Sequence, residues 1–166
     1  RDGWLTVQHG KSTQVNDIWH DGGLNVLSSL IHYPDHLPTG FITSLLEVRL
    51  NLAPAYTRAA ISHSNGAVVA FLAQHTNLAD ETAVYASYDW QLHRHLCIQS
   101  GNPIYTLILN GFTDFYEQIA QIYFRTAEAR ARSRAFYAAL SETAVAQDPA
   151  RAETICREAM QESITL

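Results

Sequence analysis

The chain has 166 residues, of which 47% are hydrophobic and 16% are charged, and its formal net charge is −5. This composition is typical of a globular domain rather than a disordered chain, and the negative charge argues against non-specific binding to nucleic acid. The two cysteines, Cys97 and Cys156, lie far apart, which argues against a disulfide scaffold or a zinc ribbon and favours a cytoplasmic protein. Since no apolar run approaches the ~20 residues of a membrane span, we expect no membrane partner.

The first element in chain order is a short β-hairpin over residues 4–15. Apolar and polar residues alternate on both sides of His9-Gly10-Lys11, which form a glycine turn. Such a tip places two donors beside a backbone that can approach a phosphate closely, although an ordinary exposed turn has the same pattern. Arg1-Asp2-Gly3 have the pattern of a helix end, so we expect the chain to be a fragment that begins after a missing segment.

The remaining sequence predicts only helices, because apolar positions recur at three- and four-residue steps. Gly22-Gly23 fall inside the first helix, and Pro54 predicts a kink or a break in the second. Gly101-Asn102-Pro103 predict the end of one helix and a capped start of the next. The expected helices span residues 17–32, 38–61, 65–76, 80–99, 103–125, 127–145 and 148–166.

The fold class that follows is all-α: an antiparallel bundle of six or seven helices, preceded by the short β-hairpin. Residues 103–125 are apolar on so many sides that this helix is expected to lie at the centre of the bundle.

Arg49 is the first candidate for a functional residue. It lies in mid-helix among Leu45, Leu46 and Val48, where a charge needs a partner or a ligand. Two structural roles would also explain it: its stem could cover apolar surface while the charge reaches water, or it could pair with an acidic residue on another helix.

Three tyrosines, Tyr105, Tyr116 and Tyr123, lie on the helix expected over residues 103–125. Buried tyrosine hydroxyls need hydrogen-bond partners, so these side chains either complete an aromatic core or line a long apolar cavity with a few polar contacts.

Asp89 and His93 are four residues apart and therefore share a helix face, where they could bind a metal or simply contact each other. A closed metal site needs two more ligands, and no histidine follows His95. The sequence contains no P-loop, GxGxxG, HExxH or GxSxG motif. We therefore expect that the protein is not an enzyme and that it has no catalytic residue, no metal and no cofactor.

Several stretches resemble, in the same order and spacing, the FadR family of fatty-acid-responsive transcription regulators in the GntR superfamily. The resemblance covers essentially the whole chain. Its most specific stretches are Arg1–Lys11 (RDGWLTVQHGK), Ser100–Tyr105 (SGNPIY) and Leu107–Gly111 (LILNG). Weaker matches are Gly23-Leu24-Asn25, Val48-Arg49 with Asn51, and Tyr123-Phe124 followed by Glu128-Ala129-Arg130.

The resemblance implies a missing N-terminal winged helix-turn-helix, which in that family reads operator DNA as part of a homodimer. Residues 1–16 would be the remnant of its wing, and residues 17–166 would be the effector-binding domain. His9, Gly10 and Lys11 match the wing-tip positions that contact DNA in the family.

The resemblance further implies that the bundle binds a long-chain acyl-CoA, which releases the protein from operator DNA. The residues that match pocket positions are Leu45, Leu46, Arg49, Tyr116, Tyr123 and Ser163, and Phe112 is expected on the same wall. A pocket phenylalanine of the family appears here as His93, and a family glycine appears as Met160. Both departures bear on affinity and on the preferred chain length.

Two other functions fit parts of this pattern. Many GntR relatives bind a metal through an Asp and three histidines and sense small carboxylates. Asp89 and His93 match the first two positions, whereas the other two are aromatic, around Phe136–Tyr137, and Ser163. A ligand-free dimerisation module would instead have a filled core.

Overall fold

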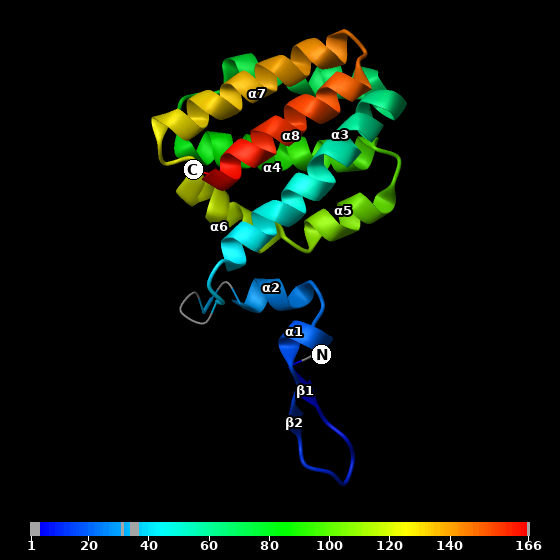
Figure 1. Cartoon of the computed structure of the whole chain (residues 1–166), viewed down its shortest axis with the longest axis vertical. Coiled ribbons are helices and arrows are strands. Elements are labelled where there is room, and N and C mark those ends of the chain that lie inside the picture. Colours follow the sequence, from blue (N-terminus) through cyan, green and yellow to red (C-terminus); the bar gives the residue numbers. More distant parts are fainter. Residues whose placement is uncertain (1–3, 31, 34–36, 166) are drawn as a thin grey trace.

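The computed structural model describes residues 4–30, 32–33 and 37–165, and Figure 1 shows a hairpin at one end of the molecule and a helical bundle at the other. The helix end expected at Arg1–Gly3 lies outside the described residues. The fold class is confirmed: apart from the hairpin, the described secondary structure is helical.

The hairpin consists of β1 (Leu5–Thr6) and β2 (Gln14–Val15), which pair antiparallel with Leu5 opposite Val15. Its turn closes with a 3.1 Å hydrogen bond from the Lys11 amide to the Gln8 carbonyl. Gly10 has a φ of 76°, a left-handed conformation that costs glycine little. The glycine turn predicted from His9-Gly10-Lys11 is therefore present.

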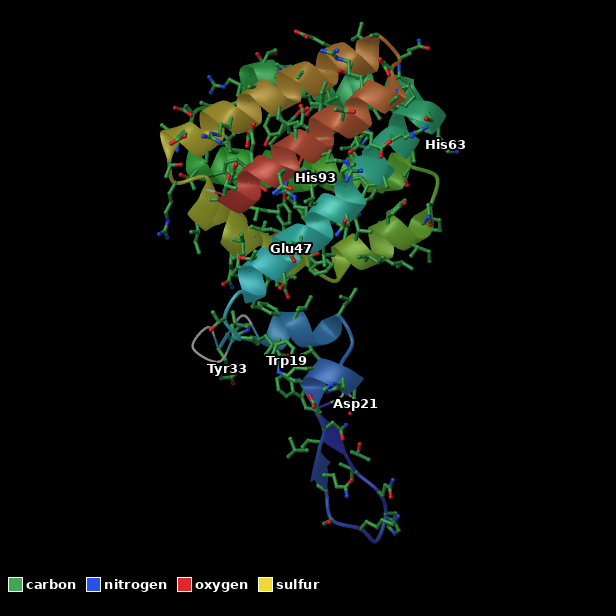
Figure 2. The ribbon with its side chains drawn as sticks, in the orientation of Figure 1. Trp19, Asp21, Tyr33, Glu47, His63 and His93 are labelled. Atoms are coloured by element: carbon green, nitrogen blue, oxygen red, sulfur yellow. The ribbon has the colours of Figure 1, made fainter. Side chains whose placement is uncertain are left out.

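A short neck joins the hairpin to the bundle. It contains α1 (Ile18–Asp21) and α2 (Asn25–Leu30), which are separated at Gly22-Gly23, as the sequence had suggested. Trp19 of α1 contacts Phe41 edge to face, with ring centroids 5.8 Å apart, and Phe41 contacts Phe115 at 5.6 Å. Aromatic contacts thus connect the neck to the interior of the bundle; Figure 2 labels Trp19 beside α1.

The longest helix is α3 (Phe41–Leu72), which is followed by the 3₁₀ segment η2 (Ala73–Asn77). Of the kink or break expected at Pro54, the break does not occur, because α3 continues through this buried proline. The backbone departs from helical geometry at Ser64 instead, in the gap between the two helices expected over 38–61 and 65–76. Packing of α3 against α4, α7 and α8 offsets the hydrogen bond that Pro54 removes.

The core lies among α3, α4 (Thr82–Gln99), α7 (Ala127–Val145) and α8 (Pro149–Thr165). Its largest side chains with no exposed surface include Leu72, Tyr85, Leu92, Leu96, Tyr137 and Leu140. Buried side chains recur at three- and four-residue steps on these helices and pack against one another, and the burial of their apolar surface is the main stabilising contribution.

The single central helix expected over residues 103–125 is also wrong. The chain forms α5 (Pro103–Asn110) and α6 (Thr113–Tyr123), with a break at Gly111-Phe112, and both lie on the side of the bundle (Figure 1). Asn102 caps α5 by accepting from the Ile104 amide, as predicted. None of the α5 side chains is fully buried, because one face of this helix meets a cavity and the other meets solvent.

Candidate ligand-binding cavity

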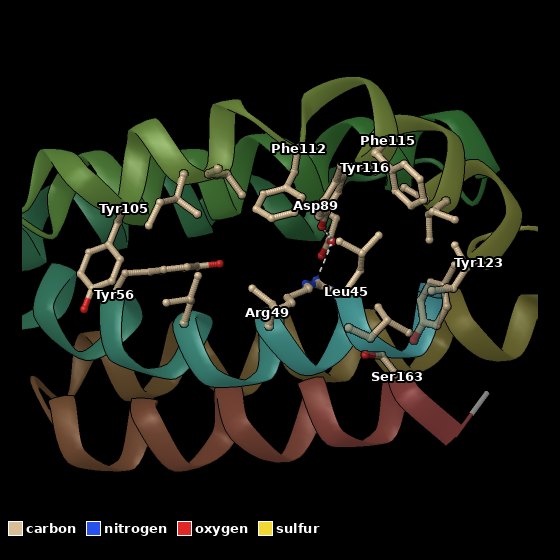
Figure 3. A pocket seen from close by; sticks show the side chains of 18 of the residues that line it. Leu45, Arg49, Tyr56, Asp89, Tyr105, Phe112, Phe115, Tyr116, Tyr123 and Ser163 are labelled. Carbon is tan, nitrogen blue, oxygen red and sulfur yellow. Dashed lines mark hydrogen bonds and ion pairs between the residues drawn. The ribbon is translucent and has the colours of Figure 1, made fainter. Parts of the chain in front are cut away.

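A cavity of about 130 Å³ lies between α3 on one side and α5 and α6 on the other (Figure 3). Most of its wall is aliphatic or aromatic, and charged groups occur at one place along it. The wall residues of α3 are Ile42, Leu45, Leu46, Val48, Arg49, Leu52 and Tyr56; α5, α6 and the residues flanking them contribute Tyr105, Ile108, Leu109, Phe112, Phe115, Tyr116, Ile119, Ala120, Tyr123 and Phe124; and Asp89 and Ser163 complete it.

The structure brings together on this wall seven of the eight residues that the sequence suggested for ligand binding: Leu45, Leu46, Arg49, Phe112, Tyr116, Tyr123 and Ser163. Their contact with a ligand stays a prediction. The eighth, His93, is fully buried and is not among the side chains that line the cavity. His93 was expected at a pocket position of the family, but this imidazole lies behind Arg49 and Tyr56, with which it shares hydrogen bonds.

Arg49 forms an ion pair with Asp89, the kind of partner that a charge in mid-helix requires. Its guanidinium donates to Asp89 Oδ2 at 3.0 Å, and it also lies over the Tyr116 ring, 5.5 Å from the centroid. The exposed fractions are 22% for the Arg49 side chain and 6% for that of Asp89. The pair joins α3 to α4 and is the interhelical ion pair that the sequence had left open as one alternative.

Asp89 is the centre of a buried polar cluster. The hydroxyls of Tyr116 and Tyr137 both donate to its carboxylate, the latter at 2.8 Å. Burial alone would raise the pKa of Asp89, but the Arg49 guanidinium and these hydrogen bonds outweigh that effect and hold the pKa below its usual value. Asp89 therefore stays ionised, and its charge compensates that of Arg49.

The geometry determines which nitrogen of His93 carries the proton. Arg49 can only donate, so His93 Nε2, 2.8 Å from its guanidinium, must accept. Nδ1 then carries the hydrogen and donates to Tyr56 Oη at 2.7 Å. Burial lowers the pKa of His93, Arg49 lowers it further, and it falls to about 4, so the ring is neutral near pH 7.

A second, smaller cavity of about 30 Å³ adjoins the first and shares with it Arg49, Asp89, Tyr123, Phe124 and Ser163. The rest of its lining comes from α7 and α8, namely Arg132, Ser133, Phe136, Ala159, Met160 and Glu162. Arg132 is two-fifths exposed and lies 3.8 Å from Glu162. The charged cluster thus lies between an apolar cavity and a more polar one.

The remaining suggested site residues lie elsewhere. His9, Gly10 and Lys11 are exposed at the tip of the hairpin, which projects away from the bundle (Figure 1). Among the described residues, no three His, Cys, Asp or Glu side chains cluster as a metal site would require. Nor does this part of the chain contain a helix with the length and hydropathy needed to cross a membrane.

Sequence reasoning missed Tyr56, which is buried and lines the cavity. A signal was present: Tyr56 follows Arg49 by seven residues, or two helical turns, and so shares its face. Tyr137 was noted only as an aromatic residue at a former metal position, and its hydrogen bond to Asp89 depends on how α7 packs on α4.

Comparisons with known proteins agree with this architecture. The FadR C-terminal domain family matches residues 16–166. The "Fatty acid metabolism regulator protein" of Shewanella amazonensis is 42% identical over 147 residues, covering 87% of this chain and 60% of that protein. The protein of the same name from Shewanella frigidimarina is 43% identical over 145 residues, with the same coverage of 87% and 60%. The chain thus spans about three-fifths of these relatives.

Among solved structures, a GntR protein of Streptococcus agalactiae superposes with a TM-score of 0.62. The match covers 99% of this chain and 76% of that one at 18% sequence identity, a level that supports a shared fold and no more.

Proposed function

The chain belongs to the FadR C-terminal domain family, and we propose that it is the effector-binding part of a transcription regulator of fatty-acid metabolism. In this proposal it acts by binding rather than by catalysis. The names of its relatives, which describe regulators of fatty-acid metabolism, support this role.

We propose that the effector is a long-chain acyl-CoA whose tail occupies the larger cavity. The observation that carries the proposal is an apolar cavity between α3, α5 and α6 whose charged lining, within the described part of the chain, is Arg49 and Asp89. Each buried CH₂ contributes about 0.8 kcal/mol, so a fourteen-carbon tail could supply on the order of 10 kcal/mol before ordering costs. That exceeds the few kcal/mol that separate two conformations of a typical bundle.

The CoA part would lie toward the smaller cavity. Asp89 already compensates the charge of Arg49, so the phosphates need another cation. Arg132 is the other basic residue that lines the smaller cavity; it donates to Glu128 at 2.8 Å and lies 3.8 Å from Glu162. Because both ion pairs are solvent-exposed and therefore weak, a phosphate could replace either carboxylate.

Ligand binding would release a homodimer from operator DNA. The tail would press on Phe115, which contacts Phe41 and, through it, Trp19 in the neck. A shift of the neck would move the hairpin, and with it the DNA-reading domains, out of register with their half-sites. His9, Gly10 and Lys11 would contact the DNA.

Calorimetric titration with acyl-CoAs of increasing chain length tests the proposal. Affinity should rise with length until the cavity is full and then level off. Trp90 provides a second signal, because its ring centroid lies 5.0 Å from that of Tyr116 on the cavity wall. Failure to bind any acyl-CoA by either method would refute the acyl-CoA assignment.

The metal-dependent alternative has weaker support. Both nitrogens of His93 are engaged, and the Arg49 cation lies 2.8 Å from the one that would face Asp89. A metal would have to displace this guanidinium and bind next to its charge. A ligand-free dimerisation module would be expected to have a filled core, and the apolar cavity does not fit that expectation.

A further inference from the structure

Tyr56 lies on the cavity wall and has a buried hydroxyl that has no role in the proposed function. Its exposed fraction is 4%, and Figure 3 shows its ring extending toward Arg49. The neighbouring wall is apolar, so a hydroxyl at this place needs hydrogen-bond partners.

The hydrogen bonds around His93 determine what Tyr56 offers. Because Arg49 must donate to Nε2, His93 donates from Nδ1, and Tyr56 Oη is the acceptor in that contact. The hydroxyl proton of Tyr56 therefore takes no part in this hydrogen bond and remains free to be donated elsewhere. No hydrogen bond donated by Tyr56 occurs among the described residues, so its O–H is a buried donor that lacks an acceptor.

Arg49 offers a second donor of the same kind. Its Nε atom is buried and has no hydrogen-bond partner within the described part of the chain. Both groups belong to α3, two helical turns apart, and both side chains line the same cavity. Leaving a buried donor unpaired is costly, and two such donors on side chains that line one cavity indicate that an occupant supplies the acceptor.

We propose that Tyr56 donates a hydrogen bond to the carbonyl oxygen of an acyl thioester bound in the cavity. The inference rests on the proposed function and deepens it, because it places the reactive end of the acyl group beside Arg49 and Tyr56. A carbonyl oxygen has two lone pairs and no proton, which suits a wall that presents only unpaired donors. Tyr56 then makes the site specific for acyl thioesters over ligands with an equally long but purely alkyl tail.

A pair of ligands that differ in one oxygen tests the contact. Myristoyl-CoA carries the thioester carbonyl, whereas S-tetradecyl-CoA is the thioether that lacks it. A neutral hydrogen bond in a buried site contributes roughly a three- to tenfold difference in affinity. The chain should bind the thioester tighter by that factor, and Tyr56→Phe should reduce the ratio of the two dissociation constants to about one.

Tyr105→Phe is the matched control. Tyr105 lines the same cavity and contacts Tyr56 edge to face at 5.8 Å, but its hydroxyl points away from Arg49 in Figure 3. This variant should keep the full preference for the thioester. If Tyr56→Phe folds poorly because His93 Nδ1 loses its acceptor, the double variant Tyr56→Phe/His93→Phe removes both polar groups and tests the same ratio.

Infrared spectroscopy of the bound ligand gives an independent measurement. The carbonyl stretch of myristoyl-CoA labelled with ¹³C at that carbon should lie at lower frequency in the unaltered chain than in Tyr56→Phe. Equal frequencies, or equal binding of thioester and thioether by the unaltered chain, would overturn the hydrogen bond but leave the proposed function standing. Absence of binding by both ligands would overturn the proposed function itself.

Discussion

The two sides of the bundle differ in how completely their side chains fill the interior. Between α3, α4, α7 and α8, Leu92, Leu96, Tyr137 and Leu140 have no exposed surface, and their side chains pack directly against one another. Between α3, α5 and α6, the side chains are mostly half-buried and surround a cavity. One side therefore holds the fold together, while the other keeps space for a ligand.

The Arg49–Asp89 pair lies where these two sides meet. Its carboxylate accepts from Tyr137 on the packed side and from Tyr116 on the cavity side. A charge pair in this position costs desolvation energy, which the hydrogen bonds from both tyrosines help to offset. The packed core thus supplies hydrogen bonds to the charged groups of the cavity wall. Substitutions on the packed side should therefore mainly lower stability, and substitutions on the cavity side should mainly change binding.

The largest effect on stability is expected at the Arg49–Asp89 pair, where the packed side and the cavity side of the bundle meet. Asp89→Asn removes one charge of a buried pair and should lower the free energy of unfolding by about 3–5 kcal/mol, since Arg49 is left uncompensated. Urea unfolding followed by circular dichroism measures this loss. Asp80→Asn is the control with the same change of charge, because Asp80 is largely exposed, and its effect should be far smaller. Equal losses of unfolding free energy in the two variants would mean that the buried Arg49–Asp89 pair stabilises the fold no more than an exposed ion pair does.

The next effect compares a leucine from each side. Leu92→Ala in the packed core should cost about 2–5 kcal/mol, because it creates a new cavity among tightly packed side chains. Leu46→Ala, on the wall of an existing cavity, should cost about 1 kcal/mol or less, since fewer contacts are lost. The same denaturation experiment ranks them. A reversed order would contradict the division into a packed side and an open side.

His93 should make stability depend on pH. Its pKa is about 4 in the folded chain, against 6.5 for an unperturbed histidine, so the unfolded chain binds the extra proton first. The contribution of His93 to the free energy of unfolding should therefore be fully present above pH 6.5 and should be lost as the pH drops toward 4, by about 3 kcal/mol in all.

The variant His93→Phe isolates this contribution. Replacing the imidazole should remove most of the slope between pH 4 and 6.5 and leave the loss below that range, where Asp89 takes up its proton. Melting temperatures across this interval provide the measurement. An unchanged slope would assign the pH dependence to other groups, and His93 would not be a neutral bridge between Arg49 and Tyr56.

A smaller and more selective effect is expected on the cavity wall. Leu46→Trp should fill part of the cavity and shorten the longest acyl chain that binds well by roughly two carbons, each worth about 0.8 kcal/mol. Calorimetry over a series of acyl-CoAs measures the change. Glu47→Trp adds the same bulk at the next, exposed position of α3 and should leave the length preference alone. A shift in both variants would point away from the cavity.

The smallest effect on the bundle should come from the hairpin. Lys11→Ala should leave stability unchanged, because Lys11 is exposed at the tip. Joined to the N-terminal part of the Shewanella amazonensis relative, the same variant should bind operator DNA more weakly across all sequences, with a salt slope reduced by about one. Fluorescence anisotropy at several salt concentrations measures both quantities, and identical binding would make the hairpin tip a passive turn.

Local patterns in the sequence were sufficient to predict most of the elements. The glycine turn at His9-Gly10-Lys11, the capped start of α5 at Asn102 and the limits of α7 all depend on residues close together in the chain. The wall of the cavity was also anticipated in large part, because Leu45, Leu46 and Arg49 share a helix with a clear apolar stripe.

The errors arose where distant segments decide the outcome. Pro54 lies within a continuous helix because packing against other helices offsets its missing hydrogen bond, and residues 103–125 bend at Gly111-Phe112 around a cavity that periodicity does not reveal. Residues close together in the chain therefore predict where most helices lie and which of their faces are apolar. The contact of Arg49 with Asp89, the place of His93 behind them and the unpaired hydroxyl proton of Tyr56 could not be predicted in this way, because each depends on how separate helices pack against one another.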